Sequence, residues 1–164
     1  MLAKRNPGDL AYLEGNQFFE DGDYDRALAK YDEALAEVPE HIHALRGRAR
    51  SLMQLGRTPE SLLAFNTVIA LEPDFGAAYA NRGILHDRMG RYEKAIADYE
   101  KAMELEPETV EGPHWLTRFL RNQPEKPPGI AERAAYLRKE LAKAPEDRLL
   151  RVPELDAEQR TYKQ

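Results

Sequence analysis

Apolar residues recur at helical spacing along most of the chain. In residues 27–35 they stand at positions i, i+1, i+4, i+7 and i+8, namely Ala27, Leu28, Tyr31, Ala34 and Leu35. Residues 95–103 repeat this spacing with Ala95, Ile96, Tyr99, Ala102 and Met103. One apolar stripe along an otherwise polar segment is typical of an amphipathic α-helix. The pattern therefore predicts an all-α protein.

The same pattern returns every 34 residues, so that residues 8–41, 42–75 and 76–109 align without gaps. In this alignment, two columns of equivalent positions hold small residues, one column holds glycine and one holds an aromatic residue. A proline stands near the end of every unit. The columns are 15/49/83 and 27/61/95 for the small residues, 22/56/90 for glycine, 31/65/99 for the aromatic residue, 34/68/102 for Ala or Val, and 39/73/107 for proline. Each unit is therefore predicted to be two helices that approach closely at the small residues and end at the proline.

The acidic stretch DGDYD at residues 21–25 falls on the turn between the two helices. It opens like a calcium-binding EF-hand loop, but such a loop needs Gly at its sixth position and Glu at its twelfth. Arg26 and Asp32 occupy these positions, so we interpret the stretch as a glycine turn. We expect Asp23 and Thr58 to be helix N-caps, with Pro59 at the first helical position.

These columns resemble the tetratricopeptide repeat (TPR) family, above all AAYANRGILHDRMGRYEKAIADYEKAMELEP at residues 77–107. The resemblance implies antiparallel helix pairs stacked into a right-handed superhelix, a TPR solenoid. It also implies a concave groove formed mostly by the first helix of each repeat. Three regular repeats are expected, followed by a degenerate fourth helix pair that serves as a C-terminal cap.

The domain organisation follows from the repeat. We expect an N-terminal lead at 1–7, repeats at 8–41, 42–75 and 76–109, capping helices at 110–145, and a tail at 146–164. In the cap, EGPHWLTRFLRNQ and IAERAAYLRKELAKAP both have amphipathic spacing. The second of these places four apolar residues on one face, namely Ile130, Ala134, Leu137 and Leu141.

Groove residues are assigned by the resemblance. The candidate peptide-binding residues are Tyr12, Asn16, Phe19, His43, Arg46, Arg50, Asn81, Ile84 and Arg88. Residues 41–57 carry four Arg and two His without any Asp or Glu. Arg46 and Arg50 lie four residues apart on one helix face, where two like charges repel and an anionic partner would offset the repulsion. Asn16 and Asn81 could hydrogen-bond a peptide backbone.

Some family members hold a C-terminal carboxylate with a clamp of Lys, Asn, Asn, Lys and Arg. This chain has Tyr12, Gly47, Ala77 and Asn81 at four of those positions, and only Asn16 matches. The arginine pair predicts an anionic ligand, which is either an acidic segment or a C-terminal carboxylate, and the residues leave this choice open.

Catalytic and metal-binding motifs are absent from the sequence. There is no phosphate-binding loop, no G-x-S-x-G, no H-E-x-x-H and no cysteine. In HIH at residues 41–43, helical geometry would point the two rings in nearly opposite directions. We therefore expect no catalytic residue, no metal and no cofactor.

Composition excludes two further classes of partner. The net charge of −5 does not suit nucleic-acid binding, and no apolar run is long enough for a membrane span or a secretory signal. The sequence predicts a cytoplasmic, non-enzymatic adaptor that binds a protein or peptide partner. The alternative is a self-associating homo-oligomer whose groove or end binds another copy or its own tail.

Overall fold

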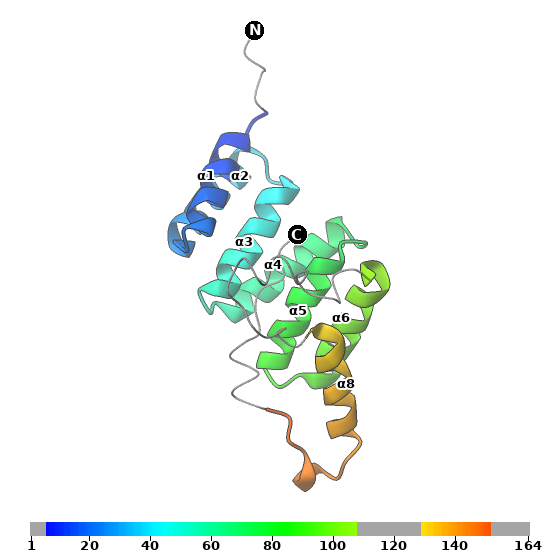
Figure 1. Ribbon diagram of the computed structural model, residues 1–164. Coiled ribbons are helices and arrows are strands. Elements are labelled where there is room, and N and C mark those ends of the chain that lie inside the picture. The colour runs from blue at the N-terminus through cyan, green and yellow to red at the C-terminus, as the bar shows by residue number, and fades with distance from the viewer. Residues whose placement is uncertain (1–5, 108–128, 152–164) are drawn as a thin grey trace, which may run out of the picture. The chain divides into compact units, whose positions relative to one another are not determined.

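All regular elements in the described part of the chain are helical. The structure is a computed structural model that describes residues 6–107 and 129–151 (Figure 1). The chain divides into two compact units, residues 1–73 and 74–164. Within the described ranges, none of the helices has the length and apolar character that crossing a membrane requires.

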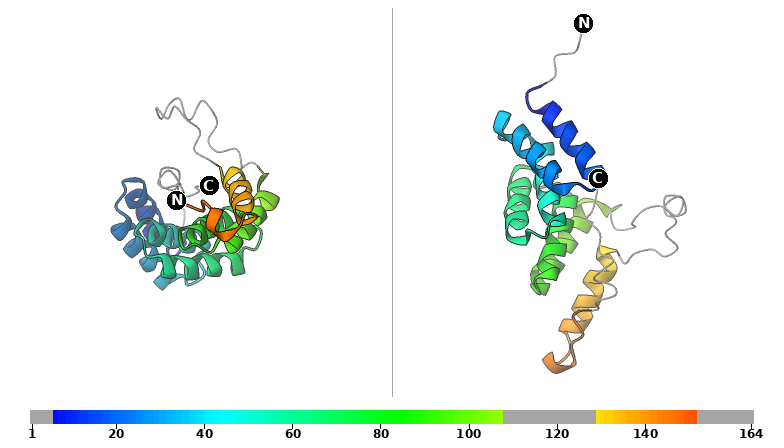
Figure 2. Two further views of the ribbon diagram at one scale, coloured as in Figure 1. Left: turned by 90° about the horizontal axis from the view of Figure 1, so that it is seen from below. Right: turned by 90° about the vertical axis from the view of Figure 1, so that its left-hand side faces the viewer.

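The first unit consists of two helix pairs. Its helices are α1 (Asp9–Glu20), α2 (Tyr24–Glu37), α3 (Ile42–Gln54) and α4 (Thr58–Leu71). The two blue helices of the first pair lie side by side in both views of Figure 2. These pairs coincide with the first two predicted repeats.

The second unit contains the third pair and a further helix. Its elements are α5 (Gly76–Arg88), α6 (Tyr92–Leu105), α8 (Ile130–Leu141) and the short 3-10 helix η2 (Pro145–Asp147). Helix α8 packs against α6. The all-α architecture of antiparallel pairs is thus confirmed, whereas the superhelical course of the whole stack stays a prediction.

The turns inside the pairs use glycine as predicted. Gly22, Gly56 and Gly90 have φ values of 80°, 71° and 71°, a left-handed conformation that glycine adopts without a steric penalty. Asp23 caps α2 by accepting a hydrogen bond from the Arg26 N–H at 3.2 Å. The N-cap prediction for Thr58 is wrong, because α4 already begins at Thr58 and Arg57 holds the capping position.

Tyr31 fills the space where α1 and α3 come closest to α2. A Cβ atom added to Gly15 would lie 2.8 Å from the Tyr31 ring, and one added to Gly47 would overlap the ring still more. In the next pair, the buried Ser61 hydroxyl donates to the Ala49 carbonyl at 2.9 Å, which joins two of the small-residue columns directly. The predicted role of the small residues is confirmed at these contacts.

The predicted capping pair is described only in its second half. The Trp115 helix, in the range 108–128, lies outside the described residues. In α8, Ile130, Ala134 and Leu137 are buried as predicted. Leu141 is only half-buried, and the carboxylate-bearing Glu140 beside it is buried instead.

We predict that Gly47→Ala lowers the free energy of unfolding by about 1–3 kcal/mol, because the new methyl group would force the enclosed Tyr31 ring to move. Gly76→Ala is the matched control. The three atoms nearest to its methyl group would all belong to the Glu106 side chain, which can shift more easily than an enclosed ring. Urea unfolding of both variants measures the difference, and an equal or smaller loss for Gly47→Ala would contradict the packing.

Candidate functional site

Six of the nine predicted site residues lie on two helices of the first unit. Tyr12, Asn16 and Phe19 belong to α1, and His43, Arg46 and Arg50 belong to α3. We call these six residues the α1–α3 surface. Helices α1 and α3 are in contact, so the predicted groove residues of the first two repeats come together.

One end of the α1–α3 surface is aromatic. The Tyr12 ring centroid lies 5.2 Å from that of His41 and 5.7 Å from that of His43. The two imidazole centroids are 6.2 Å apart, so the expectation that these rings point in opposite directions is wrong. The reason is that His41 precedes α3 as its N-cap, with Nδ1 accepting from the Ala44 N–H and Nε2 3.1 Å from the Asp9 carboxylate.

This end also borders a hollow in the surface. The hollow has a volume of about 410 Å³ and is lined by Asn6, Pro7, Asp9, Val38, His41, Ile42 and His43. No group of three or more His, Cys, Asp or Glu side chains within residues 6–107 and 129–151 is placed to hold a metal ion.

Asn16 is oriented by the packed tyrosine. The Tyr31 hydroxyl donates a hydrogen bond of 2.7 Å to Asn16 Oδ1. This bond uses the acceptor end of the Asn16 amide and leaves its two N–H donors for another partner. Burial raises the pKa of Tyr31 to about 12, so the hydroxyl remains a donor at neutral pH.

Arg46 and Arg50, which the sequence analysis predicted to act together, have different surroundings in the structure. Arg46 donates from Nε to Glu72 Oε2 at 2.8 Å, and its Nη2 also contacts this carboxylate. The charge of Arg46 is therefore neutralised within the first unit by the residue that follows α4. A ligand is not needed to offset it.

Arg50 has a different environment. Its guanidinium carbon lies 4.2 Å from the centroid of the buried Phe19 ring, a cation–π geometry. The buried Arg50 Nε has no hydrogen-bond partner, and no carboxylate of the described ranges forms an ion pair with Arg50. Burial lowers the pKa of Arg50, although an arginine remains cationic at neutral pH.

The other three predicted site residues belong to α5 of the second unit. Asn81 and Ile84 are each 2% exposed, so their side chains are closed to a ligand in this structure. Arg88 is exposed at the C-terminal end of α5.

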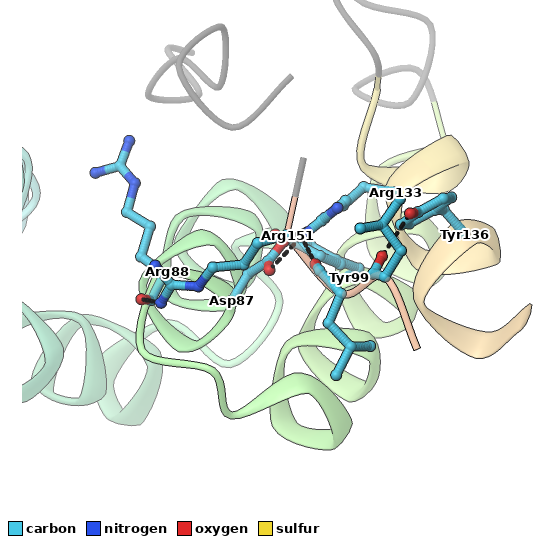
Figure 3. A network of polar contacts seen from close by, with 8 residues as sticks. Asp87, Arg88, Tyr99, Arg133, Tyr136 and Arg151 are labelled. Carbon is cyan, nitrogen blue, oxygen red and sulfur yellow. Dashed lines mark hydrogen bonds and ion pairs between the residues drawn. The ribbon is translucent and has the colours of Figure 1, made fainter. Parts of the chain in front are cut away.

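Next to Arg88 lies a buried polar network (Figure 3). Asp87 accepts two hydrogen bonds from Arg133 of α8, from Nε at 2.7 Å and from Nη2 at 2.8 Å. The Tyr99 hydroxyl also donates to Asp87, at 3.2 Å. Asp87 is 4% exposed and Arg133 is 7% exposed, so this is a buried ion pair.

Sequence reasoning missed Glu72, Arg133 and the ion pair that Arg133 forms with Asp87. The only available signal was Arg133, a charge whose spacing from Ile130 and Leu137 puts it on the apolar face of α8. Glu72 stands among ordinary surface charges in the sequence, and nothing there marks it as a functional residue.

Two tetratricopeptide repeat models match the chain, one over residues 18–81 and the other over residues 76–108. The chain belongs to the tetratricopeptide repeat family. The DnaJ homolog subfamily C member 7 homolog of Dictyostelium discoideum is 32% identical over 102 residues, which cover 60% of this chain and 19% of that protein. Stress-induced-phosphoprotein 1 of Caenorhabditis elegans is 31% identical over 136 residues, which cover 81% and 42%.

A solved TPR domain shares the fold. The first TPR of Spaghetti (RPAP3), bound to the HSP90 peptide SRMEEVD, superposes with a TM-score of 0.60 at 26% sequence identity. The match covers 79% of this chain and 94% of that one. The aligned region spans only 18–19% of the first curated relatives, which are much longer proteins. The chain is thus a helical protein-binding module of the TPR type.

We predict that the stability of the TPR module falls as the pH rises from 10 to about 12. The pKa of Tyr31 is raised from 10.0 to about 12 in the folded state, so the unfolded state loses this proton first. The stabilising contribution is complete below pH 10, and roughly 2–3 kcal/mol disappears as the pH approaches 12.

Urea unfolding at steps between pH 9 and pH 12 tests this. Tyr31→Phe should show a shallower fall than the wild type, whatever its stability at neutral pH. Tyr92→Phe, which changes a tyrosine of α6 that is not fully buried, is the control and should keep the wild-type slope. Equal slopes for wild type and Tyr31→Phe would contradict the role of the buried hydroxyl.

Proposed function

We propose that the chain is a non-enzymatic, cytoplasmic adaptor that binds an acidic, extended segment of a partner protein on the α1–α3 surface. The observation that carries this proposal is Arg50, a partly buried cation of α3 that forms no ion pair within the described residues. A ligand carboxylate could pair with the accessible part of the guanidinium group.

The neighbouring arginines support this choice of anchor. Arg46 is paired with Glu72, Arg48 with Asp32 at 2.6 Å, and Arg57 with Glu60 at 2.5 Å. A charge-assisted hydrogen bond between an unpaired guanidinium and a ligand carboxylate is stronger than a neutral one. Among these arginines of the first unit, Arg50 gains most from an anionic ligand.

The surroundings of Arg50 suit a peptide chain. The Phe19 ring lies against the Arg50 guanidinium, and Tyr24 packs edge-on against Phe19 at 5.1 Å between ring centroids. On α1, the helix that also carries Phe19, Asn16 offers two N–H donors for a peptide carbonyl. A rigid cation and a rigid amide donor on one surface are the elements that recognise an acidic segment and its main chain.

The comparisons favour an acidic ligand as well. The peptide SRMEEVD in the RPAP3 structure carries two Glu and one Asp. This chain lacks four of the five clamp residues that would hold a terminal carboxylate. We therefore assign the acidic side chains of the ligand, and not its C-terminal carboxylate, to Arg50.

We predict that Arg50→Gln weakens the binding of SRMEEVD about tenfold or more, because a charge-assisted bond contributes about 1.5–3 kcal/mol. The measurement is fluorescence anisotropy of the labelled peptide with the full chain. Arg48→Gln is the matched control on the same helix, because Arg48 is already paired with Asp32, and it should bind like the wild type.

Two altered peptides separate the sources of charge. SRMQQVD, which lacks both glutamates, should bind about tenfold more weakly than SRMEEVD. The C-terminally amidated SRMEEVD should bind within about twofold of the free acid. Equal binding of all peptides to wild type and Arg50→Gln would show that the α1–α3 surface does not recognise acidic segments.

A further inference from the structure

The chain turns back along α8 after η2, in a segment that we call the tail segment, Arg148–Arg151. Arg148 starts it in an extended conformation, with φ −79° and ψ 124°. The Arg148 guanidinium donates to the Leu141 and Lys143 carbonyls, both at 3.0 Å. These carbonyls lie at and beyond the last turn of α8, where they lack helical partners. The tail segment therefore begins firmly attached to the end of α8.

Side chains of α8 bind three main-chain groups of the tail segment. The Leu149 N–H donates to Glu140 Oε2 at 2.8 Å, and the Tyr136 hydroxyl donates to the Leu149 carbonyl at 2.5 Å. Arg133 Nη2 donates to the Leu150 carbonyl at 3.0 Å. Positions 133, 136 and 140 are spaced by three and four residues, so they form one row along a single face of the helix.

The tail segment is held by the guanidinium groups of Arg148 and Arg151 at its two ends and by its backbone between them. The Leu149 side chain is 59% exposed, so burial of this leucine does not hold the segment in place. Glu140 is suited to accept from the backbone, because its hydrogen bonds to Lys143 and to the Leu149 N–H lower its pKa and keep it ionised at neutral pH.

The far end of the tail segment reaches α5. Arg151 Nη2 donates to the Arg88 carbonyl at 2.6 Å, and Figure 3 shows the Arg88 side chain extending away from this contact. Arg133 joins the two helices, because it binds Asp87 of α5 and the Leu150 carbonyl at once. The row on α8 and the end of α5 thus form a binding site for a short extended main chain.

We propose that the tail segment is an intramolecular ligand of the second unit, and that it keeps extended segments of other proteins out of this site until it is displaced. Side-chain donors and acceptors that bind an extended backbone would accept a foreign segment equally well. The chain's own segment has the advantage of a covalent link, which gives it an effective concentration in the millimolar range. The proposal concerns the second unit and stands apart from peptide binding on the α1–α3 surface.

The first test measures hydrogen exchange of the Leu149 amide by NMR in the full chain. We expect this amide to be protected in the wild type and to exchange roughly three- to tenfold faster in Tyr136→Phe, which removes one bond to the segment. Tyr92→Phe is the control, because no hydrogen bond of the Tyr92 hydroxyl occurs within the described residues. An unprotected Leu149 amide in the wild type would overturn the proposal.

The second test offers the segment in trans as a labelled, terminally blocked peptide PEDRLLR, which copies residues 145–151. Leu149→Pro removes the N–H that Glu140 accepts, and the extended Arg148 tolerates a following proline. The peptide should bind this variant at least about tenfold more tightly than the wild type. Leu149→Ala keeps the N–H and should behave like the wild type. Equal binding to all three chains, or to none, would overturn the proposal.

Dilution distinguishes the chain's own segment from that of a second copy. Protection of the Leu149 amide should be unchanged between about 1 mM and about 10 µM protein, because an intramolecular contact does not depend on concentration. Loss of protection on dilution would overturn the intramolecular assignment and show that a neighbouring copy supplies the segment.

Discussion

The close approach of helices around one aromatic ring per pair is the constraint on which the rest of this structure depends. Tyr31 fits against α1 and α3 only because Gly15 and Gly47 have no side chains there, and Tyr99 fits against Gly83 in the same way. Each ring also carries its hydroxyl to a polar side chain, Asn16 for Tyr31 and Asp87 for Tyr99. The residue that sets the helix spacing therefore also orients a functional group.

The same position of the repeat holds an aromatic residue in the first unit and a carboxylate in the second. Phe19 and Asp87 are separated by two periods of 34 residues and occupy the same column. In the first unit the aromatic ring supports Arg50, a cation from the neighbouring repeat. In the second unit the carboxylate binds Arg133, a cation from α8. The first arrangement contains no ion pair with its cation, whereas the second pairs its cation with a carboxylate of the chain.

Local and periodic features were predictable, and long-range ion pairs were not. The helices, the glycine turns and the packed tyrosines follow from residues that are close in sequence or related by the period. The Thr58 cap was misplaced by one residue, because helix starts depend on backbone geometry that several residues can satisfy. Arg46 pairs with Glu72 across 26 residues, and Arg133 pairs with Asp87 across 46. Pairs so far apart in the sequence leave no pattern in a single sequence. The excess of Arg over Asp and Glu in residues 41–57 therefore could not show which arginine is paired with a carboxylate of the chain.

The ion pairs within the chain also determine which arginine would contribute binding free energy toward an acidic ligand. Asp87 holds Arg133 through two hydrogen bonds in a buried site, and a ligand carboxylate would have to displace a partner that is already in place. Arg50 requires no such displacement. The chain carries a net charge of −5, so its overall field does not attract an anion. In the proposed function, recognition of an acidic segment would therefore rest on short-range contacts at Arg50, Asn16 and their aromatic neighbours, and selectivity would come from geometry and not from net charge.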